Sequence, residues 1–267
     1  MVTVLDEILA SKRDEVTLLH RPEVRNLLRS EALGAPPPRD FAAALRPEHG
    51  NLAVVAEIKR RSPSKGDLAR DLDPAATAAA YAEGGAACLS VLTDRLFFGG
   101  SVDDLHAARA ACGLPVLRKD FVIDEVQVFE TRAVGADALL LIAAAIPDDA
   151  LLADLHALAV DLALAVLVEA HDEAELERAF AIGARIVGVN ARDLGTFDED
   201  LGVGEGLVAG VPPDVIAIAE SAIRSVEDAA RMAVAGFDAV LVGEMLVKAQ
   251  DPTGAVRELA SISRRTR

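Results

Sequence analysis

Eight short apolar runs, rich in β-branched side chains, recur along this chain at nearly regular intervals. They begin at Val54, Cys88, Pro115, Ala138, Leu164, Ile186, Val215 and Ala239. Their starts lie 22 to 34 residues apart, which is the length of one strand followed by one helix. Eight such units in succession predict an α/β fold, a closed TIM (β/α)8 barrel with parallel strands inside a ring of helices.

The helical patterns between these runs carry recognisable boundary residues. Asp73-Pro74 is expected to begin one helix, with proline in its first turn, and Ser101–Asp104 to begin another. Five glycines are expected to end helices in the left-handed conformation, namely Gly84, Gly113, Gly135, Gly183 and Gly236. The region after the sixth run is glycine-rich and has the weakest helical pattern.

An open, doubly wound sheet is the competing architecture. Such a sheet usually carries a glycine fingerprint directly after its first strand. Here the first run is followed by Arg60-Arg61-Ser62-Pro63, and the glycine-rich string Gly202–Gly206 follows no clear strand. The sequence therefore favours the barrel.

The first fifty residues do not follow the repeating pattern. Residues 3–19 and 23–31 are expected to form helices, and Gly34–Pro38 must be an extended connector. We expect a single domain over residues 1–267, in which an N-terminal helical extension (1–50) caps a barrel (53–262).

Composition and charge narrow the class of partner. The net charge of −16 argues against a nucleic-acid or anionic-membrane partner, for which a basic face is expected. No apolar run reaches the ~18 residues that span a bilayer, and the N-terminal segment is acidic where a signal peptide is basic. The five histidines (His20, His49, His106, His156, His171) lack ligand spacing, and Cys88 and Cys112 lack a CxxC partner. We expect a cytoplasmic protein without a metal site.

Polar side chains end five of the eight predicted strands, where barrel enzymes place their catalytic groups. These are Glu57 and Lys59, Lys119, Glu169, Asn190 with Arg192 just beyond, and Glu220-Ser221. Because side chains alternate along a strand, Glu57 and Lys59 share one face and should both point into the barrel. A purely stabilising Glu–Lys pair is the alternative, although it would carry a desolvation cost.

Lysines and glutamates that converge without metal ligands fit proton transfer, since each group can act as a general acid or base. A Schiff-base lysine is the other use of such residues, and the sequence leaves both open. A phosphate site is expected separately at Ser221-Ala222 and Gly243-Glu244, where barrels often hold phosphate on backbone N–H groups, with Ser62–Gly66 opposite. The alternative is that Gly243 serves only to allow a tight turn between the strand and the following loop.

Several longer strings in fixed order resemble one enzyme family. They are Ala56–Ser64, Val91–Asp94, Phe98–Ser101, Leu117–Phe121, Leu167–Glu169, Gly188–Leu194 and Ala219–Ser221. The chain resembles the indole-3-glycerol-phosphate synthases over about residues 53–247. The resemblance implies a lyase of tryptophan biosynthesis that converts 1-(2-carboxyphenylamino)-1-deoxyribulose 5-phosphate to indole-3-glycerol phosphate, with loss of CO₂ and water.

The resemblance also implies roles for individual residues. Lys119 matches the general acid, and Glu57, Lys59 and Glu169 match the residues of the later proton transfers, in an order that stays open. The substrate-lining and phosphate positions are Asn190, Ser221, Phe98, Phe121, Arg192, Glu220, Ser62, Ala222, Gly243 and Glu244. No cofactor is expected. The expected partner is the small phosphorylated substrate, and the protein is expected to be a monomer or a weak homo-oligomer.

One position departs from the family, in which glycine usually follows Glu-Ser. Here the residue is Ala222. Because a left-handed alanine is strained, we expect a negative φ at residue 222.

Two rivals remain. A sugar-phosphate isomerase would be expected to carry Asp or Cys at the strand ends, which hold Lys and Glu here. A catalytically silent barrel that serves as a scaffold would be expected to lack Lys59, Lys119 or Glu169, and all three are present.

Overall fold

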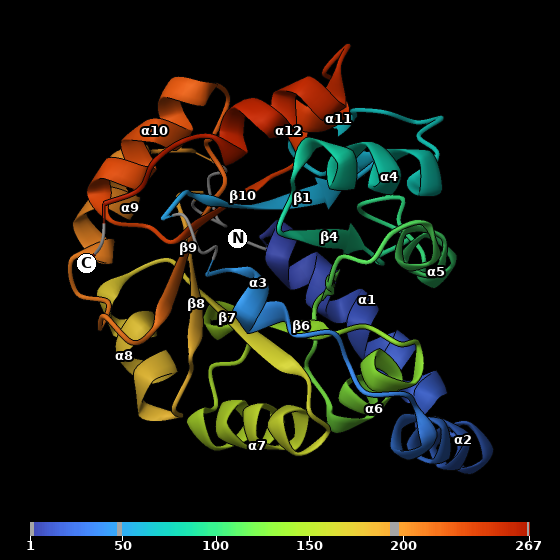
Figure 1. Ribbon diagram of the computed structural model, residues 1–267. Coiled ribbons are helices and arrows are strands. Elements are labelled where there is room, and N and C mark those ends of the chain that lie inside the picture. The colour runs from blue at the N-terminus through green and yellow to red at the C-terminus, as the bar shows by residue number, and fades with distance from the viewer. Residues whose placement is uncertain (1–2, 47–49, 193–197, 266) are drawn as a thin grey trace.

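The computed structural model describes residues 3–46, 50–192, 198–265 and 267, and the expectations that involve His49, Asp193 and Leu194 lie outside these residues. Eight parallel strands form a closed barrel in the order β1-β10-β9-β8-β7-β6-β5-β4 (Figure 1). They are β1 (Ala53–Ile58), β4 (Cys88–Leu92), β5 (Val116–Lys119), β6 (Ala138–Ile142), β7 (Ala165–Ala170), β8 (Ile186–Asn190), β9 (Ile216–Glu220) and β10 (Ala239–Val242). Each begins within one residue of its predicted start, which confirms the TIM barrel.

Helices surround the barrel, and a two-stranded hairpin, β2 (Arg61–Ser62) with β3 (Gly66–Asp67), follows β1. The ring contains α4 (Pro74–Gly84), α5 (Val102–Ala111), α6 (Glu125–Ala133), α7 (Asp149–Asp161), α8 (Glu173–Ala181), α9 (Leu201–Val208), α10 (Val226–Ala235), α11 (Glu244–Val247) and α12 (Pro252–Ala260). A 3₁₀ turn, η1 (Ala143–Ala145), follows β6. Asp73 and Ser101 cap α4 and α5 as predicted, and the glycine-rich string lies within α9.

Two of the five glycines do not end a helix as predicted. Gly84 is the last residue of α4, and the left-handed residue is Gly85, with φ 92°. A side chain at Gly84 would meet Thr253 O at 2.6 Å and Val256 Cβ at 2.7 Å, so this glycine permits the close packing of α4 on α12. Gly113 follows an extended C-cap residue, Cys112, and needs no left-handed conformation. Gly135, Gly183 and Gly236 have positive φ as predicted.

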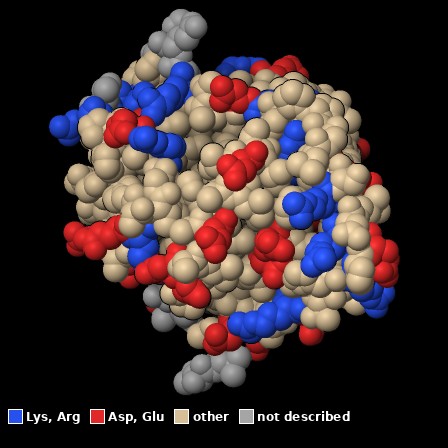
Figure 2. All heavy atoms as spheres, turned by 90° about the horizontal axis from the view of Figure 1, so that it is seen from below, with Lys and Arg blue, Asp and Glu red and all other residues tan. Residues whose placement is uncertain are grey.

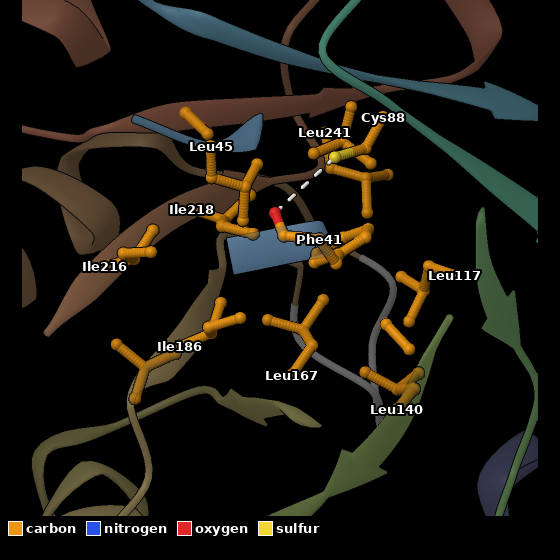
Figure 3. Packing of buried hydrophobic residues seen from close by; sticks show 14 of the residues in the cluster. Phe41, Leu45, Cys88, Leu117, Leu140, Leu167, Ile186, Ile216, Ile218 and Leu241 are labelled. Atoms are coloured by element: carbon orange, nitrogen blue, oxygen red, sulfur yellow. Dashed lines mark hydrogen bonds between the residues drawn. The ribbon is translucent and has the colours of Figure 1, made fainter. Parts of the chain in front are cut away.

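The short helix α3 (Phe41–Ala44) closes the N-terminal end of the barrel. Phe41 lies among inward-facing side chains of several strands, including Leu117, Leu167 and Ile218 (Figure 3). Its carbonyl oxygen accepts a weak hydrogen bond from Cys88 Sγ at 3.8 Å. This apolar plug leaves the opposite, C-terminal end as the open mouth of the barrel.

The two N-terminal helices are α1 (Val4–Leu19) and α2 (Pro22–Gly34), as the sequence predicts. Figure 1 shows α1 crossing the barrel and α2 at its periphery, packed on α6. Thr3 caps α1 through a reciprocal pair of hydrogen bonds with Asp6. Residues of α1 contribute to the wall of the barrel mouth, so this helix functions as a cap on the barrel.

Every helix in the described part of the chain is too short or too polar to cross a membrane. On the face shown in Figure 2, acidic side chains are spread out and basic side chains are interspersed among them. On this face the acidic side chains therefore do not gather into one patch.

Candidate active site

A cavity of about 380 Å³ lies at the C-terminal ends of the strands. All fourteen predicted site residues line it: Glu57, Lys59, Ser62, Phe98, Lys119, Phe121, Glu169, Asn190, Arg192, Glu220, Ser221, Ala222, Gly243 and Glu244. Five of them lie on barrel strands, namely β1, β5, β7, β8 and β9, and the others lie in segments that follow strands, including those after β4 and β10. The structure thus brings the predicted set together in one concave, partly enclosed space.

Lys119 lies at the centre of the charged wall. Its Nζ donates to Glu169 Oε2 at 2.8 Å and to Glu220 Oε2 at 2.6 Å. Asn190 Nδ2 donates to the other oxygen of Glu169 at 2.8 Å. The ammonium group of Lys119 on β5 therefore links side chains of β7 and β9, as expected for a lysine that points into the barrel.

The two glutamates that share Lys119 differ in their electrostatic environment. Burial disfavours ionisation of both, but Lys119 and His171 hold the pKa of Glu169 well below its usual value. For Glu220, burial outweighs the attraction of Lys119, and the neighbouring Glu169 adds repulsion, so its pKa is raised to about 7. Glu220 Oε1 is buried and has no hydrogen-bond partner among the described residues. Glu220 is the carboxyl group of this pair that can carry a proton near neutral pH.

The predicted pair on β1 is also present. Lys59 Nζ lies 2.5 Å from Glu57 Oε1, and Glu57 is almost fully buried whereas Lys59 is partly open to the cavity. A side chain at Gly243 would collide with Glu57 Oε1, and φ at Gly243 is −120°. Gly243 is thus needed for the close approach of the Glu57 carboxylate and not for a left-handed turn.

Gly188 on β8 likewise leaves space for the carboxylate of Glu220. A Cβ at Gly188 would overlap Glu220 Oε1. Gly188 within β8 and Gly243 directly after β10 therefore both make room for a buried carboxylate.

Apolar side chains form another part of the wall. The rings of Phe98 and Phe121 lie 6.1 Å apart, centre to centre, and are tilted by 36°. Val4, Leu5 and Ile8 of α1 also line the cavity. Sequence reasoning missed these three because an amphipathic helix that covers a site has the same pattern as one that covers a core. The result is an apolar region suited to a flat ring.

Cationic side chains stand near the predicted phosphate segments. Lys248, which the sequence analysis missed, lines the cavity and donates to Glu244 at 2.7 Å. Arg192 pairs with Glu199 and contacts Ser64 Oγ at 2.5 Å. Arg224, also missed, lies 2.5 Å from the second oxygen of Glu199. This side of the cavity therefore combines positive side chains, each paired with a glutamate, with the predicted phosphate segments.

The expectation for Ala222 is wrong. Its φ is +59°, and that of the preceding Ser221 is +65°. The chain reverses directly between β9 and α10, and two consecutive left-handed residues make this turn. The structure keeps at residue 222 the conformation that glycine adopts more easily, so alanine is strained there.

His171 is a half-buried group near the site that sequence reasoning missed. Its Nδ1 lies 2.9 Å from Glu175 Oε2, and its Nε2 lies 3.4 Å from Glu169 Oε1. Burial disfavours the charged imidazole, but the two glutamates raise its pKa to about 10. The sequence could have indicated its position, because His171 follows Glu169 by two residues. In an extended chain its side chain is therefore expected on the same side as that of Glu169. Among the described residues, the cluster around His171 included, no group of three or more His, Cys, Asp or Glu is placed to hold a metal ion.

Comparisons with known proteins agree on one family. The family model described as indole-3-glycerol phosphate synthase matches residues 5–259. A protein of that name from Polaromonas naphthalenivorans (strain CJ2) is 49% identical over 261 residues, which cover 97% of this chain and 99% of that protein. Another from Aromatoleum aromaticum (strain DSM 19018 / LMG 30748 / EbN1) is 49% identical over 263 residues, with the same coverage.

Solved structures share the fold at low identity. Thiamine phosphate pyrophosphorylase from Pyrococcus furiosus has a TM-score of 0.59 and 17% identity, covering 80% of this chain and 96% of that one. The 3-hexulose-6-phosphate synthase from Salmonella typhimurium has a TM-score of 0.62 and 17% identity, covering 79% and 98%. At this identity the likeness concerns the fold alone.

Replacing Ala222 by glycine should stabilise the protein. Removal of the strain at a left-handed alanine should stabilise the fold by ~1–2 kcal/mol. The greater conformational freedom of glycine in the unfolded chain should destabilise the fold by ~0.4–1 kcal/mol. Denaturant unfolding should therefore show a gain of about 0.5–1 kcal/mol for Ala222→Gly. The matched control, Ala230→Gly within α10, should instead lose about 1 kcal/mol. An Ala222→Gly variant less stable than the wild type would contradict the strain.

Replacing His171 by asparagine should have a pH-dependent effect on stability. The folded pKa of about 10 lies above the ordinary value of 6.5, so the charged imidazole stabilises the fold fully below pH 6.5. That contribution declines as the pH rises toward 10. Urea unfolding of wild type and His171→Asn should show a gap that narrows over this range. For the control His156→Asn no such narrowing is expected, because burial lowers the pKa of His156. A constant gap for His171→Asn would refute the assignment.

Proposed function

The chain belongs to the indole-3-glycerol phosphate synthase family, and we propose that the cavity at the barrel mouth is where it performs the family's reaction. The enzyme is a carboxy-lyase of tryptophan biosynthesis. The observation that carries the assignment of the site is the convergence of Lys119, Glu169, Glu220 and the Glu57–Lys59 pair beside an apolar wall. The proposed substrate is 1-(2-carboxyphenylamino)-1-deoxyribulose 5-phosphate.

The two unlike sides of the cavity match the two ends of this substrate. The anthranilate ring would lie against Phe98 and Phe121, which supply flat apolar surface. The phosphate would lie near Ser62, Ser221-Ala222 and Gly243-Glu244, where backbone N–H groups and Lys248 are available. Asn190, Arg192 and Glu220 would contact the chain between them. This orientation presents the ketone to the charged wall.

Lys119 would act as the general acid of ring closure. The aromatic carbon that bears the carboxylate attacks the ketone carbon, and Lys119 gives a proton to the ketone oxygen, which becomes a hydroxyl group. Burial disfavours its ammonium form, but Glu169, Glu220 and Glu57 raise the pKa of Lys119, so the group is charged when the substrate arrives. Positioned proton transfer of this kind contributes ~10²–10⁴-fold to a rate.

The remaining steps need further proton transfers. Loss of CO₂ from the ring carbon that made the new bond then restores the aromatic ring. Departure of the new hydroxyl group as water then requires an acid at the oxygen and a base that removes a proton from the five-membered ring. Glu57, Lys59 and Glu169 would divide these tasks, since all three line the cavity. The steps consume only substrate and release CO₂ and water.

We also propose that the enzyme works in the cytoplasm as a monomer or weak homo-oligomer. A net charge of −16, with signs interspersed on the surface, favours a protein that stays dispersed.

The function and the role of Lys119 are tested together. Purified wild type mixed with the substrate should develop the fluorescence of indole-3-glycerol phosphate. Lys119→Met should lower kcat by ~10²–10⁴-fold while it still binds the product. A second variant, Lys119→Met with Glu220→Gln, reduces the surplus of buried negative charge and controls for folding. Absence of wild-type turnover would overturn the function. A folded Lys119 variant with more than about a tenth of the wild-type kcat, chemistry being rate-limiting, would overturn only the role of Lys119.

The Glu57–Lys59 pair is expected to serve the reaction rather than stability. The double variant Glu57→Gln, Lys59→Met should abolish turnover, whereas its midpoint of thermal unfolding should stay near that of the wild type. The reason is that removal of both partners of a buried ion pair is often neutral for stability. Circular dichroism melts and the fluorescence assay measure the two effects separately. Unfolding of the variant without a separable loss of activity would favour the stabilising interpretation.

A further inference from the structure

Lys12 is a buried lysine outside the charged wall of the cavity. It lies on α1, the N-terminal helix added to the barrel, and its side chain is only 1% exposed. Its Nζ lies 2.9 Å from each of three carboxylates, those of Glu15, Asp94 and Asp120. Burial disfavours its charge, but the two aspartates raise the pKa of Lys12, so it stays an ammonium group. A charge so completely withdrawn from water requires such partners.

The two aspartates depend on Lys12 in turn. Asp94 is fully buried, and its Oδ2 accepts no hydrogen bond within the described part of the chain. The ammonium group 2.9 Å away is the cation paired with that oxygen. Asp120 is 3% exposed and has a second cation near it, Arg118, at 3.4 Å. Asp94 is therefore the partner that loses most if Lys12 is removed.

Each aspartate also fixes a loop that carries one phenylalanine of the apolar wall. Asp94 Oδ1 accepts hydrogen bonds from the backbone N–H groups of Phe97 at 2.7 Å and Phe98 at 3.2 Å. Asp120 Oδ1 accepts one from the N–H of Phe121 at 2.8 Å. The same carboxylates that receive Lys12 thus hold the backbone of Phe98 and Phe121.

Lys12 also shares a helix face with the cavity-lining part of α1. Ile8 precedes it by four residues, so the two side chains lie on one side of the helix. Ile8 is buried and lines the cavity together with Val4 and Leu5. Lys12 anchors this face to the ends of β4 and β5.

We propose that Lys12 is a positioning residue for substrate recognition, which holds α1, Phe98 and Phe121 together so that the apolar wall fits the aromatic ring. The inference rests on the proposed function, because it gives this wall a ring to bind. Lys12 does not touch the reacting atoms. Its loss should therefore weaken binding of substrate and product more than it slows the chemical steps.

The first test is the steady-state kinetics of Lys12→Met. We expect KM to rise about tenfold or more while kcat changes less than about threefold, since a loss of binding common to substrate and transition state affects KM alone. Arg13→Met is the matched control, because it removes one positive charge from an exposed position of the same helix. Its KM and kcat should equal those of the wild type. A Lys12 variant that matches this control, or that loses kcat with unchanged KM, would overturn the proposal.

A second variant keeps the test valid if Lys12→Met alone folds poorly. Lys12→Met with Asp94→Asn removes both charges of this buried pair, so that Asp94 does not remain as an unpaired carboxylate. The amide oxygen of the asparagine can still accept from the N–H groups of Phe97 and Phe98. Leu9 and Val16 retain their apolar contacts, so α1 should stay attached. The double variant should fold and show the raised KM. Loss of the folded barrel in both variants would make Lys12 purely structural and refute the proposal.

Two further measurements address position directly. If Lys12 seats α1, then Ile8→Ala should raise KM in the wild type but add little in the Lys12→Met background, and simple additivity would count against the mechanism. Hydrogen exchange needs no substrate, so it separates failure of this inference from failure of the proposed function. Amides of α1 and of Phe97, Phe98 and Phe121 should exchange faster in Lys12→Met than in Arg13→Met, and equal exchange would refute the proposal.

Discussion

The ammonium group of Lys119, held between Glu169 and Glu220, allows a charged site to exist inside an apolar barrel. An isolated buried carboxylate would neutralise itself by taking up a proton, and two adjacent ones cannot both stay ionised without a cation. Lys119 keeps Glu169 ionised, whereas the pKa of Glu220 rises to about 7. The division of roles in the site follows from this one shared cation. Asn190 and His171 then hold Glu169 from its other side.

Space is as necessary to this arrangement as charge. Gly188 and Gly243 face the carboxylates of Glu220 and Glu57, and any side chain at either position would overlap them. A glycine within a strand usually weakens a sheet, yet Gly188 in β8, like Gly243 just after β10, admits a buried carboxylate. The barrel thus combines large aliphatic side chains at its closed end with missing side chains at its open end. Its chemistry depends on both.

The sequence predicts the strands well, and the period of two along a strand also predicts which polar side chains at the strand ends face the cavity. Once Leu117 is known to face inward, Lys119 must do so too, and the same rule applies to Glu57 with Lys59. The conformation of Ala222 could not be predicted in this way, because the turn after β9 determines its φ. The preference of alanine for negative φ does not change that conformation and only makes it strained. Val4, Leu5 and Ile8 of α1 also escaped prediction, since amphipathic pattern does not say whether a helix covers a core or a cavity. Asp94 and Asp120, the buried partners of Lys12, lie more than eighty residues away in the sequence and come near it only in the folded barrel.

The same alternation explains how the barrel and its N-terminal cap are joined at the site. Lys119 and Asp120 are consecutive residues at the end of β5, so their side chains leave the chain in different directions. Lys119 reaches Glu169 and Glu220 across the mouth, and Asp120 reaches Lys12 on α1. Any shift of this strand end would disturb the proposed acid and the anchored helix together. Two adjacent residues therefore couple the charged wall, where we propose that the chemistry takes place, to the apolar wall, where we propose that the ring binds.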